Sequence, residues 1–401
     1  MLTRNPQLPR RPVLDWSGFS RLDAPTVNSV EDLPNVVFTT SGRAAIFHAL
    51  MQLELRAGTP VLVPTYHCPT MIAPVHLASL TTRYFGLRPD GLPNLDTIDD
   101  ATANRAKAMI VSHYFGLAQS LAEVRQWCDV RGIALIEDCA HCYFGAAGER
   151  PVGAWGDFST ASLSKFFPVP EAGLLASANR PISALALSAP SWRAQAKGWL
   201  DVVETAVAHD RVAGFNAALG LVFRIKNARH SRGRKNTEVT VAQTIEQAMM
   251  RDCDMARINA APLHASMLIK SMLPRGRIIA LRERNFSRYA DCFADVRGAR
   301  PLFAPPASVT APYVFPLWVD DAERVYAALI AQEMPVFRWD QLWPGMPDIA
   351  GDVGPSWSRH VLQLLCHQDL HEKDIDRIAC AVLSLLPRPQ ESITEPLLQH
   401  A

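Results

Sequence analysis

The stretch Gly156-Asp-Phe-Ser-Thr-Ala-Ser-Leu-Ser-Lys165 is an apolar strand pattern that ends in a lysine. Lysine is rare at the end of an apolar strand, because removing its charge from water is costly. Desolvation also lowers the pKa of a lysine, which makes its amine a better nucleophile toward a carbonyl carbon. The stretch therefore predicts a strand that carries a reactive amine at its end.

A second strand pattern, Leu135-Ile-Glu-Asp-Cys-Ala-His141, ends in two carboxylates and a histidine. Parallel sheets bind ligands at the carboxyl ends of their strands, so we expect Asp138 and His141 to lie at a site of chemistry. A buried carboxylate needs a cationic partner, and a protonated pyridine nitrogen would be one that keeps the ring an electron sink. Asp138 taken alone is equally consistent with a cap on the next turn. Together with Lys165, it favours a catalytic site over packing.

A third segment, Thr39-Thr-Ser-Gly-Arg-Ala-Ala45, leads from a strand through a turn of small residues into a helix. Such a turn presents free backbone N–H groups and the positive end of a helix to an anion. A Ser-Gly pair before a helix is also a common N-cap without any ligand, and this segment alone does not distinguish the two.

Apolar runs with strand character alternate with helical patterns in the first half of the chain. Ala44–Leu55 repeats apolar residues at helical spacing, and Ser120 followed by Glu123 predicts a capping box that opens a helix through Val130. This rhythm predicts an α/β fold, with a mainly parallel sheet flanked by helices on both faces. The strand-like runs are Val36–Thr39, Val61–Pro64, Thr82–Phe85, Ala108–Ser112, Ile133–Asp138, Phe158–Leu163 and Gly173–Ala176.

The chain divides into four predicted parts. They are an irregular arm at 1–29 on the surface or on a partner subunit, a large domain at 30–274, a smaller C-terminal α+β domain at 275–388, and a tail at 389–401. Within the large domain, residues 180–250 form a helical insertion with the basic stretch Arg229–Lys235. Such a charge run is usually a solvated loop, and the alternative is a clamp for an anionic substrate.

Composition excludes several classes of partner. Forty Lys and Arg residues against 39 Asp and Glu give a formal net charge of +1, so no overall field attracts nucleic acid or a membrane surface. No apolar run approaches the ~20 residues that cross a bilayer, and the polar start lacks the apolar core of a signal peptide. We expect a cytoplasmic protein with small-molecule partners. The eight cysteines lack the spacing of a disulfide framework, and for the single CxxC at Cys139 and Cys142 we expect no metal.

Over most of its length, the sequence resembles the DegT/DnrJ/EryC1/StrS family of sugar aminotransferases that use pyridoxal 5'-phosphate (PLP). The resemblance implies the fold type I of PLP-dependent transferases, and a homodimer with active sites between subunits. It also implies transfer of an amino group from glutamate or glutamine to a keto-sugar, usually a nucleotide-linked one. The motifs appear in the family's order: Ser41-Gly-Arg-Ala-Ala45, Val63-Pro-Thr65, His113-Tyr-Phe-Gly116, Glu137-Asp-Cys-Ala-His141, Gly156-Asp157, Lys165 followed by Gly173, Leu365-Cys-His-Gln368 and Asp374-Ile-Asp-Arg-Ile378.

The resemblance assigns roles to three of the strand-end residues. Lys165 would hold PLP as a Schiff base and, once displaced by an amino donor, would act as the general base that moves a proton between substrate and cofactor. Asp138 would pair with the pyridine nitrogen, and His141 would face the cofactor ring.

The phosphate group would be held by the helix-opening turn at Gly42 and Arg43. Ser162 is a candidate for a phosphate hydroxyl, although the usual serine of the family lies two residues further from the lysine.

The sequence departs from the family pattern at three places. Cys68 occupies the position of the aromatic residue that stacks on the cofactor, so Tyr66 or His67 would have to supply the flat face. Met255 replaces an asparagine that reaches the phosphate from a neighbouring subunit, and Arg257 or the basic stretch is the candidate substitute. The insertion at 180–250 is longer than the family pattern.

Two alternatives to amino transfer remain at this stage. Family relatives that carry a histidine in place of the lysine catalyse dehydration of sugars, and Lys165 argues against that route. A PLP-fold protein that binds or regulates without turnover is the second alternative, favoured by the departures at Cys68 and Met255.

Overall fold

The computed structural model describes residues 7–22, 25, 27–214, 216, 220, 244–306 and 309–387. The basic stretch Arg229–Lys235, the tail at 389–401 and part of the predicted insertion lie outside the described residues. Among the described helices, none is long and apolar enough to cross a membrane.

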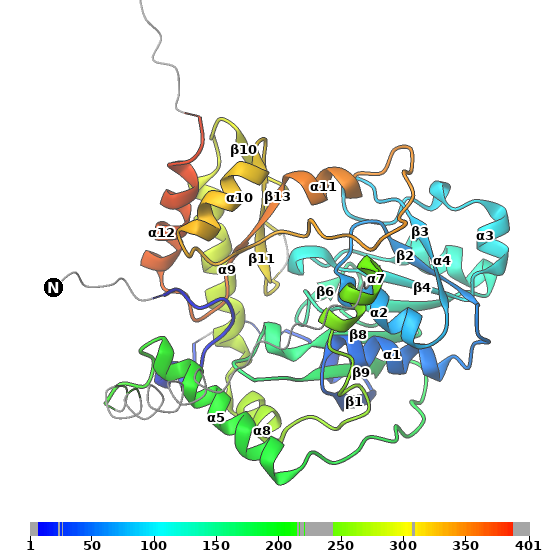
Figure 1. Cartoon of the computed structure of the whole chain (residues 1–401), viewed down its shortest axis with the longest axis horizontal. Helices are drawn as coiled ribbons and strands as arrows, with labels where there is room; N and C mark the ends of the chain where they lie inside the picture. Colours follow the sequence, from blue (N-terminus) through cyan, green and yellow to red (C-terminus); the bar gives the residue numbers. More distant parts are fainter. Residues whose placement is uncertain are drawn as a thin grey trace, which may run out of the picture.

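A seven-stranded sheet forms the centre of the first half of the chain, with the strand order β1-β9-β8-β5-β4-β2-β3 (Figure 1). All of its strands run in one direction except β9, which is antiparallel to both of its neighbours, β1 and β8. The predicted α/β fold with a mainly parallel sheet is confirmed. The strands are β1 (Asn35–Thr39), β2 (Pro60–Pro64), β3 (Thr81–Phe85), β4 (Ala108–Ser112), β5 (Ala134–Asp138), β8 (Phe158–Ser162) and β9 (Gly173–Ser177).

Both faces of this sheet are packed, because neighbouring residues of its central strands enter different hydrophobic cores. Val61 and Val63 of β2 belong to the core that contains Ile46 of helix α1, whereas Leu62 between them belongs to the core that contains Val124 of helix α4. The helices of this half are α1 (Gly42–Gln52), α2 (Pro69–Leu77), α3 (Asp100–Arg105) and α4 (Ala122–Arg131).

The capping box predicted at Ser120 is wrong. The N-cap of α4 is Leu121, which makes no side-chain cap. Ser120 donates a hydrogen bond to Glu149 at 3.1 Å, and Glu123 pairs with Arg88 at 2.9 Å instead of reaching back to the helix start. A tertiary ion pair has therefore replaced the local hydrogen bond that the sequence pattern favoured.

A smaller antiparallel sheet follows toward the C-terminus, with the order β10-β11-β13-β12. Helices α9 and α12 pack against each other beside it, and α10 packs on β11, β12 and β13 (Figure 1). This α+β arrangement agrees with the predicted fold class. The elements are α9 (Arg275–Cys292), β10 (Ala299–Pro301), β11 (Val314–Val319), α10 (Ala322–Ala331), β12 (Val336–Phe337), α11 (Gly354–His360), β13 (Val361–Leu365) and α12 (Glu372–Leu383).

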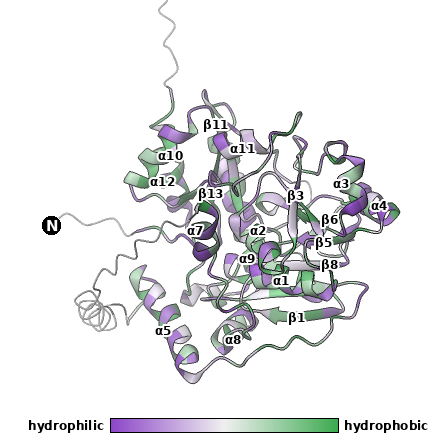
Figure 2. Cartoon of the chain, turned by 45° about the vertical axis from the view of Figure 1, so that its right-hand side comes forward, coloured by the Kyte–Doolittle hydropathy of each residue, from purple (hydrophilic) through white to green (hydrophobic). Residues whose placement is uncertain are grey.

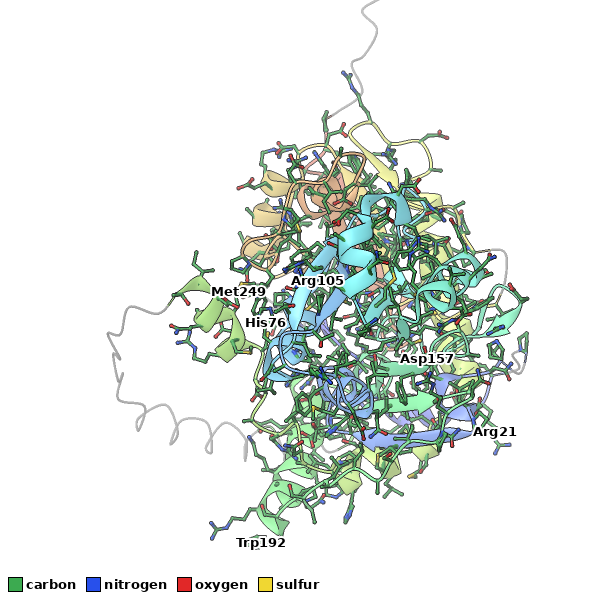
Figure 3. The ribbon with its side chains drawn as sticks, turned by 90° about the vertical axis from the view of Figure 1, so that its right-hand side faces the viewer. Arg21, His76, Arg105, Asp157, Trp192 and Met249 are labelled. Atoms are coloured by element: carbon green, nitrogen blue, oxygen red, sulfur yellow. The ribbon has the colours of Figure 1, made fainter. Side chains whose placement is uncertain are left out.

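Three described helices precede α9 in the part of the chain between the two sheets. Helix α5 (Trp192–Ala208) packs on α8 (His264–Met272), and α7 (Ile245–Asp252) packs on α2. Hydrophobic and hydrophilic residues alternate along α5 (Figure 2), and Trp192 at its start projects from the molecule (Figure 3). The remaining elements are β6 (Ala146–Ala147), β7 (Arg150–Pro151) and the short 3-10 helices η1 (Trp16–Phe19), η2 (Val30–Asp32), η3 (Leu95–Thr97), η4 (Tyr114–Gly116) and η5 (Leu163–Lys165).

Candidate active site

The carboxyl ends of neighbouring strands enclose a cavity of about 320 Å³. Asp138 is the last residue of β5, and β8 next to it leads directly into η5, which ends at Lys165. The cavity also receives the N-terminus of α1. Six residues predicted as site residues line it together: Gly42, Arg43, Asp138, His141, Ser162 and Lys165.

Asp138 is a buried carboxylate without a cation at ion-pair distance among the described residues. Its oxygens accept hydrogen bonds from the amide of Ala140 at 3.0 Å and from the hydroxyl of Ser112 at 3.4 Å. Burial raises the pKa of Asp138, although the charge of Lys165 and the Ala140 amide act in the opposite direction. A cationic N–H donor placed in this cavity would stabilise the ionised carboxylate.

The amine of Lys165 has no hydrogen-bond or ion-pair partner among the described residues, and its Nζ lies 5.0 Å from the centre of the Tyr313 ring. Burial lowers the pKa of Lys165, against the opposing influence of the Asp138 carboxylate. A lowered pKa increases the fraction of neutral, nucleophilic amine at neutral pH. The geometry therefore supports the reactive amine that the strand pattern predicts.

His141 lies in an aromatic wall of the cavity. Its ring stacks on Tyr313 with 4.4 Å between ring centres, and it lies 5.0 Å from Trp339. The Phe115 amide donates to His141 Nδ1 at 3.3 Å, which leaves the ring proton on Nε2. Burial lowers the pKa of His141 well below its usual range, and the Lys165 charge acts in the same direction. The imidazole is therefore a neutral, flat face at pH 7.

The turn that opens α1 approaches the sheet very closely. Ser41 caps the helix by accepting a hydrogen bond from the amide of Ala44 at 3.2 Å. A Cβ at Gly173 would lie 2.2 Å from the backbone of Ser41, so only glycine fits at the start of β9. The amides of Gly42 and Arg43 precede the first hydrogen-bonded turn and are therefore available to an anion.

Two arginines stand beside this turn, and each already has an acidic neighbour. Arg43 donates to the backbone of Asp254 at 3.0 Å, and Arg257 pairs with Glu171. Burial raises the pKa of Glu171 in spite of Arg257. Met255 lines the same side of the cavity. Both arginines lie where the resemblance requires a phosphate ligand, and an arriving phosphate would compete with the two carboxyl groups for them.

The structure does not support Tyr66 or His67 as the stacking residue. Both side chains are fully buried outside the cavity lining. Tyr66 packs on Tyr114 and accepts a hydrogen bond from Gln363, while the His67 imidazole bridges the carbonyl of Pro64 and the amide of Trp343. Both rings are held by the protein interior, so Cys68 alone of this segment's three candidates faces the cavity.

A buried cluster behind the site has the residue types of a metal centre. One ligand atom from each of His113, Glu137 and Cys139 lies within 4.8 Å of the others. The carboxylate of Glu137 is already satisfied, because it binds His113 at 2.8 Å and accepts hydrogen bonds from three amides, those of Gly153, Trp155 and Gly156. Burial alone would raise the pKa of Glu137, but these bonds bring it below its ordinary value. We interpret the cluster as a structural network that holds β5 in place.

Sequence reasoning missed Tyr313 and Trp339. They come from the C-terminal half, more than 140 residues after Lys165, and reach the site only through tertiary packing. The glycine of the His113-Tyr-Phe-Gly116 motif gives an indirect signal, because Gly116 has a φ of 90° and a Cβ there would lie 2.4 Å from the amide of Tyr313. The motif therefore requires another chain segment to pass close by, without indicating which one.

Comparison with known proteins identifies the family. The model of the DegT/DnrJ/EryC1/StrS aminotransferase family matches residues 30–383. The chain belongs to this family. Members of the family bind PLP or its amino form, and the family match agrees with the expected fold type I.

Individual relatives are distant. GDP-perosamine synthase of Vibrio cholerae is 26% identical over 31% of this chain and 34% of its own length. L-glutamine:2-deoxy-scyllo-inosose aminotransferase of Streptomyces kanamyceticus is 27% identical over 43% of each chain. The matched segments thus span less than half of the length of these curated relatives. The solved structure of DesV from S. venezuelae superposes with a TM-score of 0.62 over 90% of this chain and 87% of its own, at 16% identity, which supports the fold.

The residues of the cavity fit PLP. A phosphate, a pyridinium and an aldehyde require an anion site at a helix N-terminus, a buried carboxylate and a reactive amine. The carboxylate and the amine here have no ion-pair partner in the described part of the chain. All three line one cavity, at the edge of the sheet where ligands of such folds bind.

Proposed function

We propose that the protein is a PLP-dependent aminotransferase that moves an amino group from glutamate or glutamine to a nucleotide-linked keto-sugar. The observation that carries the proposal is the shared cavity of Lys165 and Asp138 at the N-terminus of α1. The cofactor would act as an electron sink for the carbon that loses its proton.

Each residue of the cavity has a distinct task in this proposal. The amine of Lys165 would hold the cofactor covalently, and Asp138 would hold the ring nitrogen in its protonated form. The amides of Gly42 and Arg43, with the hydroxyl of Ser162, would bind the phosphate. These contacts would hold the cofactor at three separated points and so restrict its orientation in the cavity.

Proton transfer is assigned to Lys165. Once released from the cofactor, the free Nζ of Lys165 would accept the proton from the amino-bearing carbon of the substrate and would pass it to a carbon of the cofactor. The lowered pKa of Lys165 favours this role, because a neutral amine is required to accept a proton. The neutral ring of His141 would cover one face of the cofactor without adding charge to it.

The substrates are proposed from the relatives. GDP-perosamine synthase and L-glutamine:2-deoxy-scyllo-inosose aminotransferase bear names that refer to an amino sugar and to transfer from glutamine. The same family membership supports a homodimer, which stays a prediction together with the cytoplasmic location.

The visible absorption spectrum of the purified full chain with PLP tests this proposal. Wild type should show a band near roughly 410–430 nm, and borohydride should erase the band and add the cofactor's mass to Lys165. Lys165→Ala should lack the band, whereas Lys197→Ala, which removes an exposed lysine of α5, should keep it. Glutamate or glutamine should bleach the band of wild type.

A second candidate function is ligand binding without turnover. It is favoured by Cys68, which places a thiol where an aromatic ring would stack. A wild-type band that neither amino donor bleaches would support this candidate, and an unchanged band in Lys165→Ala would exclude the lysine mechanism altogether.

A further inference from the structure

A second cavity, of about 460 Å³, opens on another side of Lys165. Ser164 and Lys165 line both cavities, so the amine stands at their junction. The volume lies in the range of small-molecule sites. With PLP in the first cavity, the second one would offer a substrate a space beside Lys165.

The walls of this cavity come from segments far apart in the sequence. Helix α5 contributes Thr205 and its C-cap residue His209, and the C-terminal half contributes Tyr313 and Phe337. The N-terminal arm contributes Gln7, Leu8, Arg10, Arg11 and Pro12. Figure 1 shows the arm, in dark blue, running between α12 and α5. The arm therefore lies on the body of its own chain and closes one side of the cavity.

Hydrogen bonds with two buried side chains, His367 and Asp369, and with the partly exposed His209 hold the backbone of the arm in this position. The carbonyl of Pro9 accepts a hydrogen bond from His367 at 3.1 Å, and the carbonyl of Gln7 lies 2.8 Å from Nδ1 of His209. The amide of Val13 donates to Asp369 at 3.1 Å. Because these bonds use backbone atoms, the arm keeps its place whichever side chains it carries toward the cavity.

The charges that face the cavity are all positive. Arg10 and Arg11 line it, and none of the described residues in its lining is Asp or Glu. Neither arginine forms an ion pair with a described residue, and the Arg10 guanidinium lies 5.7 Å from the centre of the Phe337 ring. Asp201 and Arg11 both line a smaller hollow, which Lys165 does not line. Two unpaired guanidinium groups beside a reactive amine favour an anion.

We propose that Arg10 and Arg11 form an anion subsite, which binds the carboxylate or phosphate group of a substrate while the carbon to be aminated or deaminated faces Lys165. This inference rests on the proposed function and adds the recognition of the substrate's charged group. A carboxylate would belong to the amino donor, and a phosphate to the sugar acceptor.

The test compares wild type with the double variant Arg10→Gln/Arg11→Gln by calorimetric titration of the full chain. L-glutamate is one probe, and UDP, GDP and dTDP are the others. Loss of the two charges should weaken binding about 10-fold or more. Weaker glutamate binding identifies a carboxylate subsite, and weaker nucleoside diphosphate binding identifies a phosphate subsite. The variant Arg10→Lys/Arg11→Lys keeps the charges and should recover part of the affinity.

Arg21→Gln is the matched control, because Arg21 is an exposed arginine of the same arm outside the cavity (Figure 3). Equal affinity of wild type and the double variant for every probe, or absence of binding to wild type, would overturn the anion subsite. If wild type lacks the 410–430 nm band while the double variant still weakens the binding of a nucleoside diphosphate, the proposed function fails and the subsite stands.

Discussion

The two cavities that meet at Lys165 differ in how their walls are assembled. The first is built almost entirely at strand ends and at one helix N-terminus, and several of its residues lie within short motifs such as Glu137–His141. The second is built from the arm, from α5 and from the C-terminal half, which are separated by up to about 360 residues along the chain. The proposed cofactor site thus lies in the part with local sequence signals, and the proposed anion subsite lies in the part without them.

This difference has a physical cause. A cofactor site at a sheet edge requires close backbone approaches, such as that of Gly173 to Ser41, and these restrict residue types locally. A substrate wall only has to present a side chain of the right charge at the right place, and any segment that packs there can supply it. We therefore expect substitutions in the two cavities to separate chemistry from recognition.

The largest effect is expected in the first cavity, from Asp138→Asn. The amide fills nearly the same space but cannot stabilise a protonated ring nitrogen, so the rate of bleaching by glutamate should fall about 100-fold or more. Stopped-flow absorption at saturating glutamate measures this rate. Ser112→Ala removes only the 3.4 Å hydrogen bond to Asp138 and serves as the milder control. A wild-type rate in Asp138→Asn would show that the carboxylate does not act on the cofactor.

An intermediate effect is expected from Arg282→Met, because Arg282 binds the backbone of Lys165, a residue that lines both cavities. This buried guanidinium donates to Gln368, to the carbonyl of Pro312 at 2.9 Å and to the carbonyl of Lys165 at 2.6 Å. Burial lowers the pKa of Arg282 to about 10, which shows that its buried charge is costly. Removing this charge therefore offsets part of the stability that is lost with the three hydrogen bonds. We expect a decrease of about 3 kcal/mol in the free energy of unfolding.

Denaturant unfolding monitored by circular dichroism measures this change. Arg284→Met on the same helix removes a partly exposed arginine that pairs with Glu372 at 3.4 Å, and should change stability by only about 0.5 kcal/mol. Equal free energies of unfolding for the two variants would mean that the hydrogen bonds of Arg282 to the Lys165 turn do not stabilise the fold.

The smallest effect is expected in the second cavity, from His367→Gln. Burial lowers the pKa of His367 to about 3. Between pH 6.5 and 3 the unfolded chain therefore binds more protons at this site, and wild type should lose stability as the pH falls. The loss between pH 7 and pH 5 should be about 2 kcal/mol for this residue.

Glutamine can keep the hydrogen bond to Pro9 without titrating, so the variant should lose less stability over the same interval. Asp369 acts in the opposite direction, because burial raises its pKa to about 6 and the folded chain then gains protons as the pH falls. Both proteins retain that residue, so it cancels when unfolding is compared at pH 7 and pH 5. Identical pH dependence of the two proteins would exclude His367 as the acid-sensitive anchor of the arm.

The sequence by itself determined the α/β fold and the residues at the strand ends. Alternating strand and helix patterns specify a sheet covered on both faces. A lysine or an aspartate at the end of an apolar strand loses hydration free energy, so its presence there indicates a functional role. Local patterns of this kind predict structure because residues that are close in sequence are also close in space.

Only the tertiary structure decided which aromatic rings and which cations complete the site. It turned Tyr66 and His67 into the interior, brought Tyr313 to His141, and replaced the capping box at Ser120 with an ion pair between Glu123 and Arg88. It also laid the arm beside Lys165. These contacts join residues remote in the chain, and their free energies depend on packing and burial that no local pattern records.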